Sequence, residues 1–150
     1  GFCESWRDIK QLFGVILPGN IVGCLLVALM TCFTKLPVHD AATAVLESRL
    51  ESGPLACGVL GIGCGILMTS AVAFAKKGKE FGHWVPLLFA VPLFIHCGFP
   101  HCIADAFFYS CVPLEFWASH LWEILPFYAC IVAGNFIGCN FYRWVMGENH

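Results

Sequence analysis

Four long apolar stretches constrain the fold of this chain more than any other feature of its sequence. They run from about residue 12 to 33, 55 to 75, 84 to 113 and 121 to 146. A membrane-spanning helix takes about 20 mainly apolar residues, so each stretch is long enough to cross a bilayer. Only 12% of the residues are charged, whereas soluble domains carry about 25%. We therefore predict a single all-α transmembrane domain over residues 1–150, with four spans of which the third is broken.

The charge balance and the cysteines exclude several kinds of protein. Eight Lys and Arg against ten Asp and Glu give a net charge of −2, whereas nucleic-acid binding needs a basic face. So few charges cannot cover the surface of a soluble enzyme, and we expect no enzymatic activity. The ten cysteines lie mostly in apolar stretches and form no CxxC pair, which indicates helix packing rather than a metal site or a cofactor. A membrane thiol oxidoreductase stays open as an alternative.

The basic residues set the expected orientation, because cytoplasmic loops of membrane proteins carry an excess of Lys and Arg. With four spans and a cytoplasmic N-terminus, only Lys35 and Arg49 of the eight basic residues fall outside. We expect a multi-pass protein of the plasma or inner membrane, with both ends of this chain in the cytoplasm. In the polar link, residues 40–52 are expected to form a short interfacial helix that Gly53 and Pro54 end.

One short pattern occurs in both the first and the last span. Residues 19–24 read GNIVGC, and residues 134–139 read GNFIGC. Glycines spaced four residues apart let helix backbones approach closely in lipid, and we expect such backbone contacts at all four glycines of the two copies. The residues concerned are Gly19, Asn20, Gly23, Gly134, Asn135 and Gly138. Four spans make the two helices antiparallel, so the pattern indicates an inverted repeat, a common plan of transporters.

The repeat leads to two further expectations. Its asparagines serve either helix packing alone or a function as well. If the last span is the third helix of one repeat, the first span is the third helix of the other. Two more helices are then expected before residue 1, and the chain is the last two-thirds of a six-helix protein.

The third span is interrupted near its middle by residues 97–100, which read CGFP. Proline breaks helices but suits a first helical position, so we expect Pro100 to begin a new half-helix. The start of that half-helix directs partial positive charge at the membrane centre and is a candidate anion site. His101 follows the break and is the side chain that titrates near neutral pH. Asp105 lies one turn further on and could orient the imidazole. A neutral, structural histidine is the alternative.

The sequence around this break resembles the formate/nitrite transporter family. Residues 97–108 read CGFPHCIADAFF, where the family has a segment like GFEHxxANMF. The two GN[IF][VI]GC copies resemble that family's third and sixth helices, and residues 63–68 resemble its fourth. The resemblance covers nearly all of the chain. It implies an aquaporin-like helical bundle of six helices, the second and fifth broken, assembled as a homopentamer with one pore per subunit.

The same resemblance assigns roles to particular residues. His101 corresponds to the family's central histidine, past which formate, nitrite, hydrosulfide or a related anion moves. Phe94 corresponds to a phenylalanine at a pore constriction. Three positions depart from the family: Pro100 replaces a glutamate, Asp105 replaces an asparagine, and Gly65 or Cys64 stands where the fourth helix often has a polar asparagine. The last two departures concern the hydrogen-bond partners of the histidine and leave the pore assignment intact.

We therefore predict a transmembrane channel or transporter for small monovalent weak-acid anions, with proton transfer at the central histidine. A bare anion would face a large desolvation cost at an apolar constriction, which a proton from the histidine removes. The predicted pore residues are Phe94, Gly98, His101, Cys102 and Asp105. The expected partners are the anion, membrane lipid and further copies of the chain. A purely structural four-helix membrane protein is the other alternative, but it leaves the histidine beside the proline-broken span unexplained.

Overall fold

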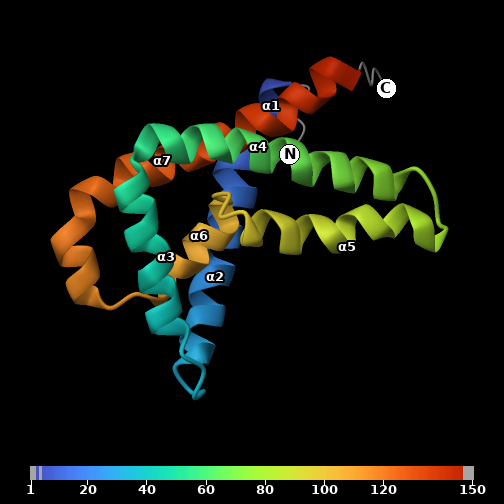
Figure 1. Ribbon diagram of the computed structural model, residues 1–150. Coiled ribbons are helices and arrows are strands. Elements are labelled where there is room, and N and C mark those ends of the chain that lie inside the picture. The colour runs from blue at the N-terminus through green and yellow to red at the C-terminus, as the bar shows by residue number, and fades with distance from the viewer. Residues whose placement is uncertain (1–2, 4, 147–150) are drawn as a thin grey trace.

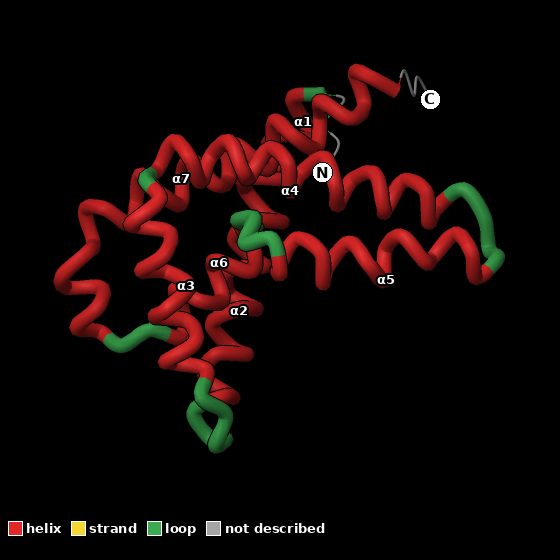
Figure 2. Tube along the Cα trace, viewed as in Figure 1, coloured by secondary structure: helices red, strands yellow, loops and turns green. Residues whose placement is uncertain are grey.

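A computed structural model describes residue 3 and residues 5–146, and every regular element in this part of the chain is helical (Figure 2). The first apolar stretch forms one continuous rod that passes through a π-helical turn, η1. The elements are α1 (Trp6–Gln11), η1 (Leu12–Ile16), α2 (Leu17–Thr31), α3 (Val38–Ser52), α4 (Pro54–Lys76), α5 (Phe81–His96), α6 (Cys102–Cys111) and α7 (Leu114–Met146). The prediction of an all-α fold is confirmed.

Three of these helices are long and apolar enough to cross a membrane. They cover Trp6–Thr31, Pro54–Lys76 and Leu114–Phe141. Two shorter apolar helices, α5 and α6, occupy the third predicted stretch, and the chain between them is not helical from residue 97 to residue 101. The break therefore lies where the sequence predicts it, within a set of helices suited to a membrane bundle.

Glycine, more than proline, sets the place of this break. Pro86 and Pro92 lie inside α5, and the helix continues past both. Gly98 has a φ of 69°, a left-handed conformation that costs glycine little and other residues much. The chain thus turns out of α5 at Gly98 and starts α6 in a new direction (Figure 1).

The tightest helix pair is α4 with α7, which lie side by side (Figure 1). A Cβ added to Gly134 would overlap the carbonyl oxygen of Gly58, and one added to Gly138 would overlap that of Ile62. The Cα of Gly65 would lie 3.0 Å from the same added atom on Gly138. Residues further along α4 contact residues further along α7, which shows that the two helices run parallel. Glycine is the only residue small enough at these contact positions.

The other copy of the pattern, on α2, differs. A Cβ added to Gly19 or to Gly23 would meet nothing within 4 Å in the described part of the chain. The expectation of close backbone contact is therefore wrong for these two glycines in this structure. In the described part of the chain α2 packs on α6, and the two glycines border an open cavity together with Ile103 and Ala104 instead of a helix backbone.

The short helix predicted in the polar link is present as α3, which ends at Ser52 and is followed by Gly53 with a φ of 85°. Ala42 and Leu46 are buried in a cluster that also contains Tyr109 of α6 and Phe116 of α7. This packing holds α3 against α6 and brings the last turns of α3 close to the helix break.

Candidate functional site at the helix break

His101 caps the start of α6. Its backbone is extended, and its side-chain Nδ1 accepts a hydrogen bond from the backbone N–H of Ala104 at 3.4 Å. The expectation that Pro100 is the first helical residue is wrong, because the helix begins at Cys102 and His101 is its N-cap. A side-chain acceptor satisfies an N–H that the first turn leaves without a partner. With Nδ1 accepting, the neutral imidazole carries its proton on Nε2.

Phe94 and His101 face each other across the break. Their rings are stacked with centroids 5.3 Å apart and an interplanar angle of 22°. Phe94 is buried near the end of α5, and the backbone N–H of Phe99 donates to its carbonyl oxygen at 2.9 Å. The turn folds back on α5, so that the two predicted pore residues form one stacked unit.

Asn135 joins three segments at the break. Its side-chain oxygen accepts from the backbone N–H of Cys102 at 2.8 Å. Its Nδ2 donates to the carbonyl oxygens of Gly61 at 3.0 Å and Pro100 at 3.1 Å. Both donors of the amide and one acceptor are thus used, which ties α4, the turn and the start of α6 to α7. The repeat singles out this residue, but its partners become visible only in the structure.

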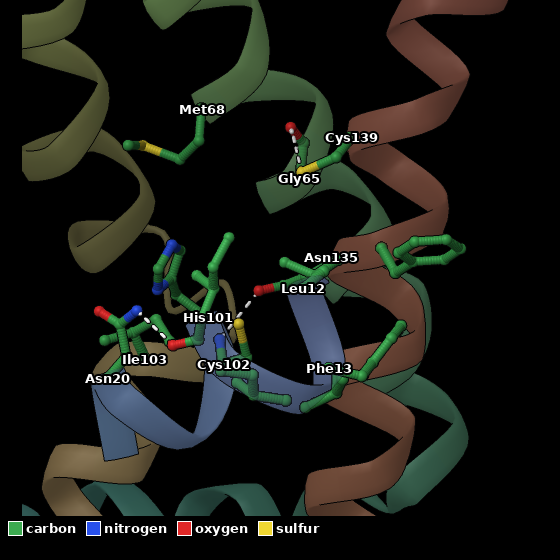
Figure 3. Close-up of a pocket in the computed structure, with 14 residues that line it drawn as sticks. Leu12, Phe13, Asn20, Gly65, Met68, His101, Cys102, Ile103, Asn135 and Cys139 are labelled. Atoms are coloured by element: carbon green, nitrogen blue, oxygen red, sulfur yellow. Dashed lines mark hydrogen bonds between the residues drawn. The ribbon is translucent and has the colours of Figure 1, made fainter. Parts of the chain in front are cut away.

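Asn20, at the matching position on α2, makes a different bond. Its Nδ2 donates to the carbonyl oxygen of Ile16, one turn earlier in its own rod, at 2.8 Å. It nevertheless borders the same cavity as Asn135, a space of about 210 Å³. Figure 3 shows both asparagines around this cavity together with His101 and Cys102. The remaining walls are mainly apolar.

Arg49 is the residue of this site that sequence reasoning missed. It extends from α3, and its Nη1 donates to the carbonyl oxygen of Gly98 at 2.5 Å. Its Nη2 lies 3.7 Å from Oδ1 of Asp105, whose side chain is only 1% exposed. The one signal in the sequence is that Arg49 and Lys35 are the only two basic residues on the expected outer side of the membrane.

Asp105 does not orient the imidazole, so that expectation is wrong. Its backbone N–H donates to the carbonyl oxygen of His101 at 2.8 Å, but its carboxylate faces Arg49. Neither carboxylate oxygen has a hydrogen-bond partner among the described residues. The imidazole Nδ1 already accepts from Ala104, so it needs no carboxylate to hold it.

A second cavity, of about 190 Å³, lies on the Phe94 side of the break. Four of the five predicted pore residues border it: Phe94, Gly98, His101 and Asp105. The fifth, Cys102, borders the first cavity. His101 lines both spaces. The break thus places one titratable side chain at the border of two small cavities, the second of which also has the charged Arg49 and Asp105 in its wall, at the N-terminus of a half-helix.

Comparison with known proteins gives one clear result. The model of the formate/nitrite transporter family matches residues 3–147 of the chain. No curated protein and no solved structure matches the chain significantly. The family match therefore covers the repeated pattern, the break and the helices that carry Arg49 and His101.

Proposed function

This chain belongs to the formate/nitrite transporter family, and from that premise we propose that it carries small monovalent weak-acid anions across a cell membrane past His101. The family is one of transporters, and the three membrane-length apolar helices agree with a membrane protein. Both properties favour transport over the thiol oxidoreductase and the purely structural protein considered from the sequence. Formate, nitrite and hydrosulfide are the proposed substrates.

The observation that carries this proposal is the place of His101 between the two cavities. The half-helix α6 begins there, and its first N–H groups with their partial positive charge attract an anion. The apolar ring of Phe94 at the constriction penalises a bare charge, because transfer of an ionised group out of water costs many kcal/mol. Protonation of the anion removes most of this cost.

The capping bond of His101 defines the proposed proton transfer. Nδ1 accepts from Ala104, so Nε2 carries the proton of the neutral ring and can hold an anion through a hydrogen bond. A doubly protonated ring has donors at both nitrogens and cannot keep the capping bond. In this proposal the imidazole first takes up a second proton, and the imidazolium then gives one proton to the anion and returns to the neutral ring that caps α6. The anion crosses the constriction at Phe94 as a neutral acid, and the imidazole regains its second proton from the aqueous side.

The wider arrangement is part of the same proposal. An aquaporin-like bundle with inverted repeats, a homopentamer with one pore per subunit and cytoplasmic ends of this chain follow from the resemblance and the repeated pattern. Native mass spectrometry in detergent tests the assembly. A dominant monomer would contradict the pentamer while leaving the transport proposal to the flux assay.

The transport proposal is tested with reconstituted protein in liposomes. Flux of formate is measured from about pH 5 to about pH 8, around the ordinary histidine pKa of about 6.5. We expect flux to depend steeply on pH, and we expect His101→Asn to flatten that dependence, because asparagine keeps hydrogen bonding but cannot carry the proton. His96→Asn, at an exposed position just before the break, is the matched control and should behave as the parent. Superimposed profiles for the parent and His101→Asn would show that His101 is structural.

A further inference from the structure

We propose that Arg49 and Asp105 form an anion subsite beside His101, at which a planar oxyanion replaces Asp105 as the partner of the guanidinium. The inference rests on the proposed transport function and extends it by naming a binding group and a preferred substrate shape. Arg49 and Asp105 come from different helices, α3 and α6, and meet next to the stacked pair of Phe94 and His101.

The hydrogen bonding of this ion pair is incomplete. The distance of 3.7 Å between Nη2 and Oδ1 exceeds that of a charge-assisted hydrogen bond, which is about 2.7–2.9 Å. Nε of Arg49 and both carboxylate oxygens of Asp105 are buried and have no hydrogen-bond partner among the described residues. Buried charged groups without such partners are costly. The guanidinium therefore has a donor, Nε, that can still bind a third group with acceptor atoms.

The space beside the pair is large enough for such a group. The second cavity, of about 190 Å³, is bordered by Arg49 and Asp105 as well as by Phe94 and His101. A single water needs only about 10–15 Å³. The cavity therefore has room for an anion of three heavy atoms with water around it, and the anion would lie within the same space as the imidazole.

The donors of Arg49 favour a planar anion. Nη1 is held by the carbonyl oxygen of Gly98, which fixes the guanidinium and leaves the edge formed by Nε and Nη2 without a close partner. Two parallel donors on one edge match the two oxygens of a carboxylate-like ion. Formate and nitrite present two such oxygens, whereas hydrosulfide presents a single sulfur.

Asp105 acts as an internal competitor in this subsite. It compensates the charge of Arg49 when no anion is present, and it competes with an anion that arrives. Conduction requires binding that is favourable enough for entry and weak enough for release. A tethered carboxylate 3.7 Å from the guanidinium meets both needs, because it lowers affinity without closing the site.

Formate uptake into proteoliposomes at fixed pH, measured against formate concentration, tests the subsite. Asp105→Asn should lower the half-saturating concentration about three- to tenfold, because the competitor is lost. Arg49→Gln should raise it about tenfold or abolish saturation, and Asp105→Asn should have no further effect on that background. Glu47→Gln, which removes an exposed acidic charge from the same helix, is the matched control. A structural pair predicts the opposite sign for Asp105→Asn, so an unchanged or raised half-saturating concentration overturns the proposal.

Arg49→Lys keeps the proposal testable if Asp105→Asn fails to fold. Lysine retains the charge but lacks the two parallel N–H donors of the guanidinium. The half-saturating concentrations of formate and nitrite should therefore rise several-fold more than that of hydrosulfide. Equal changes for all three anions would overturn the planar subsite. The outcomes remain separate from those for the transport function, since the parent protein either moves formate with the pH dependence described above or does not.

Discussion

The two copies of the GN[IF][VI]GC pattern have nearly the same sequence but different surroundings. On α7, a Cβ at Gly134 or Gly138 would overlap the backbone of α4, whereas at Gly19 and Gly23 on α2 it would meet nothing within 4 Å in the described structure. The asparagines differ in the same way. Asn135 bonds to three other segments, whereas the bond of Asn20 among the described residues stays within its own rod. The pattern specifies a small surface with an amide, and the neighbouring helix decides its use.

The reason lies in the helix on the other side. Helices in lipid gain little from hiding apolar surface, so close approach needs small residues on both partners. The helix α4 supplies Gly58 and Gly65 opposite the glycines of α7. On α2 the glycines border an open cavity together with Ile103 and Ala104 of α6, and an added Cβ would meet nothing within 4 Å in the described structure. The comparison therefore predicts that equal substitutions in the two copies have unequal effects.

The largest difference is expected at the glycines. Gly138→Leu would place a side chain against the backbone of α4 and should cost at least about 3 kcal/mol, because the helices must separate. Gly23→Leu is the matched change on α2 and should be tolerated in this chain. Expression level and thermal unfolding in detergent check both variants. Equal stability of the two would remove the distinction between a packed and an open copy.

A smaller difference is expected at the asparagines. Asn135→Ala removes the partner of the Cys102 N–H and of the Pro100 carbonyl oxygen, together with a second donor to the carbonyl oxygen of Gly61. The cost is about 1–3 kcal/mol for an unsatisfied buried group. The substitution should also reduce anion flux, since the turn that holds the histidine loses its support. Asn20→Ala removes one bond within its own rod and should cost less than about 1 kcal/mol. Thermal unfolding and liposome flux measure both, and a greater loss in Asn20→Ala would reverse the comparison.

The smallest effects, and the most similar ones, are expected at the cysteines that end each copy. Sγ of Cys24 donates to the carbonyl oxygen of Ile103 at 3.4 Å, and Sγ of Cys139 donates to that of Gly65 at 3.8 Å. A thiol is a weak donor, so Cys24→Ala and Cys139→Ala should each cost about 1 kcal/mol or less. Thermal unfolding of the two variants side by side tests this. A large loss of stability in only one of the two variants would mean that the cysteines, like the glycines, have unequal roles in the two copies.

Much of the candidate site is predictable from the sequence because its signals are local. The glycine and proline around residue 98 predict the break, and the histidine beside it stands out against apolar neighbours. Arg49 could not be predicted in the same way. Its two partners, Gly98 and Asp105, lie on segments far along the chain, and no local pattern indicates that α3 packs against α6.

The sequence by itself determined the membrane class, the helical fold, the position of the break and the family. Each depends on hydropathy, backbone preference or a short motif, which are properties of neighbouring residues. Only the tertiary structure decided which copy of the glycine pattern packs against another helix. It also decided that Asp105 faces Arg49 instead of His101, and that Asn135 holds the turn through hydrogen bonds. These contacts join residues from different helices, and the energy of a contact depends on the atoms that the partner helix brings within about 4 Å.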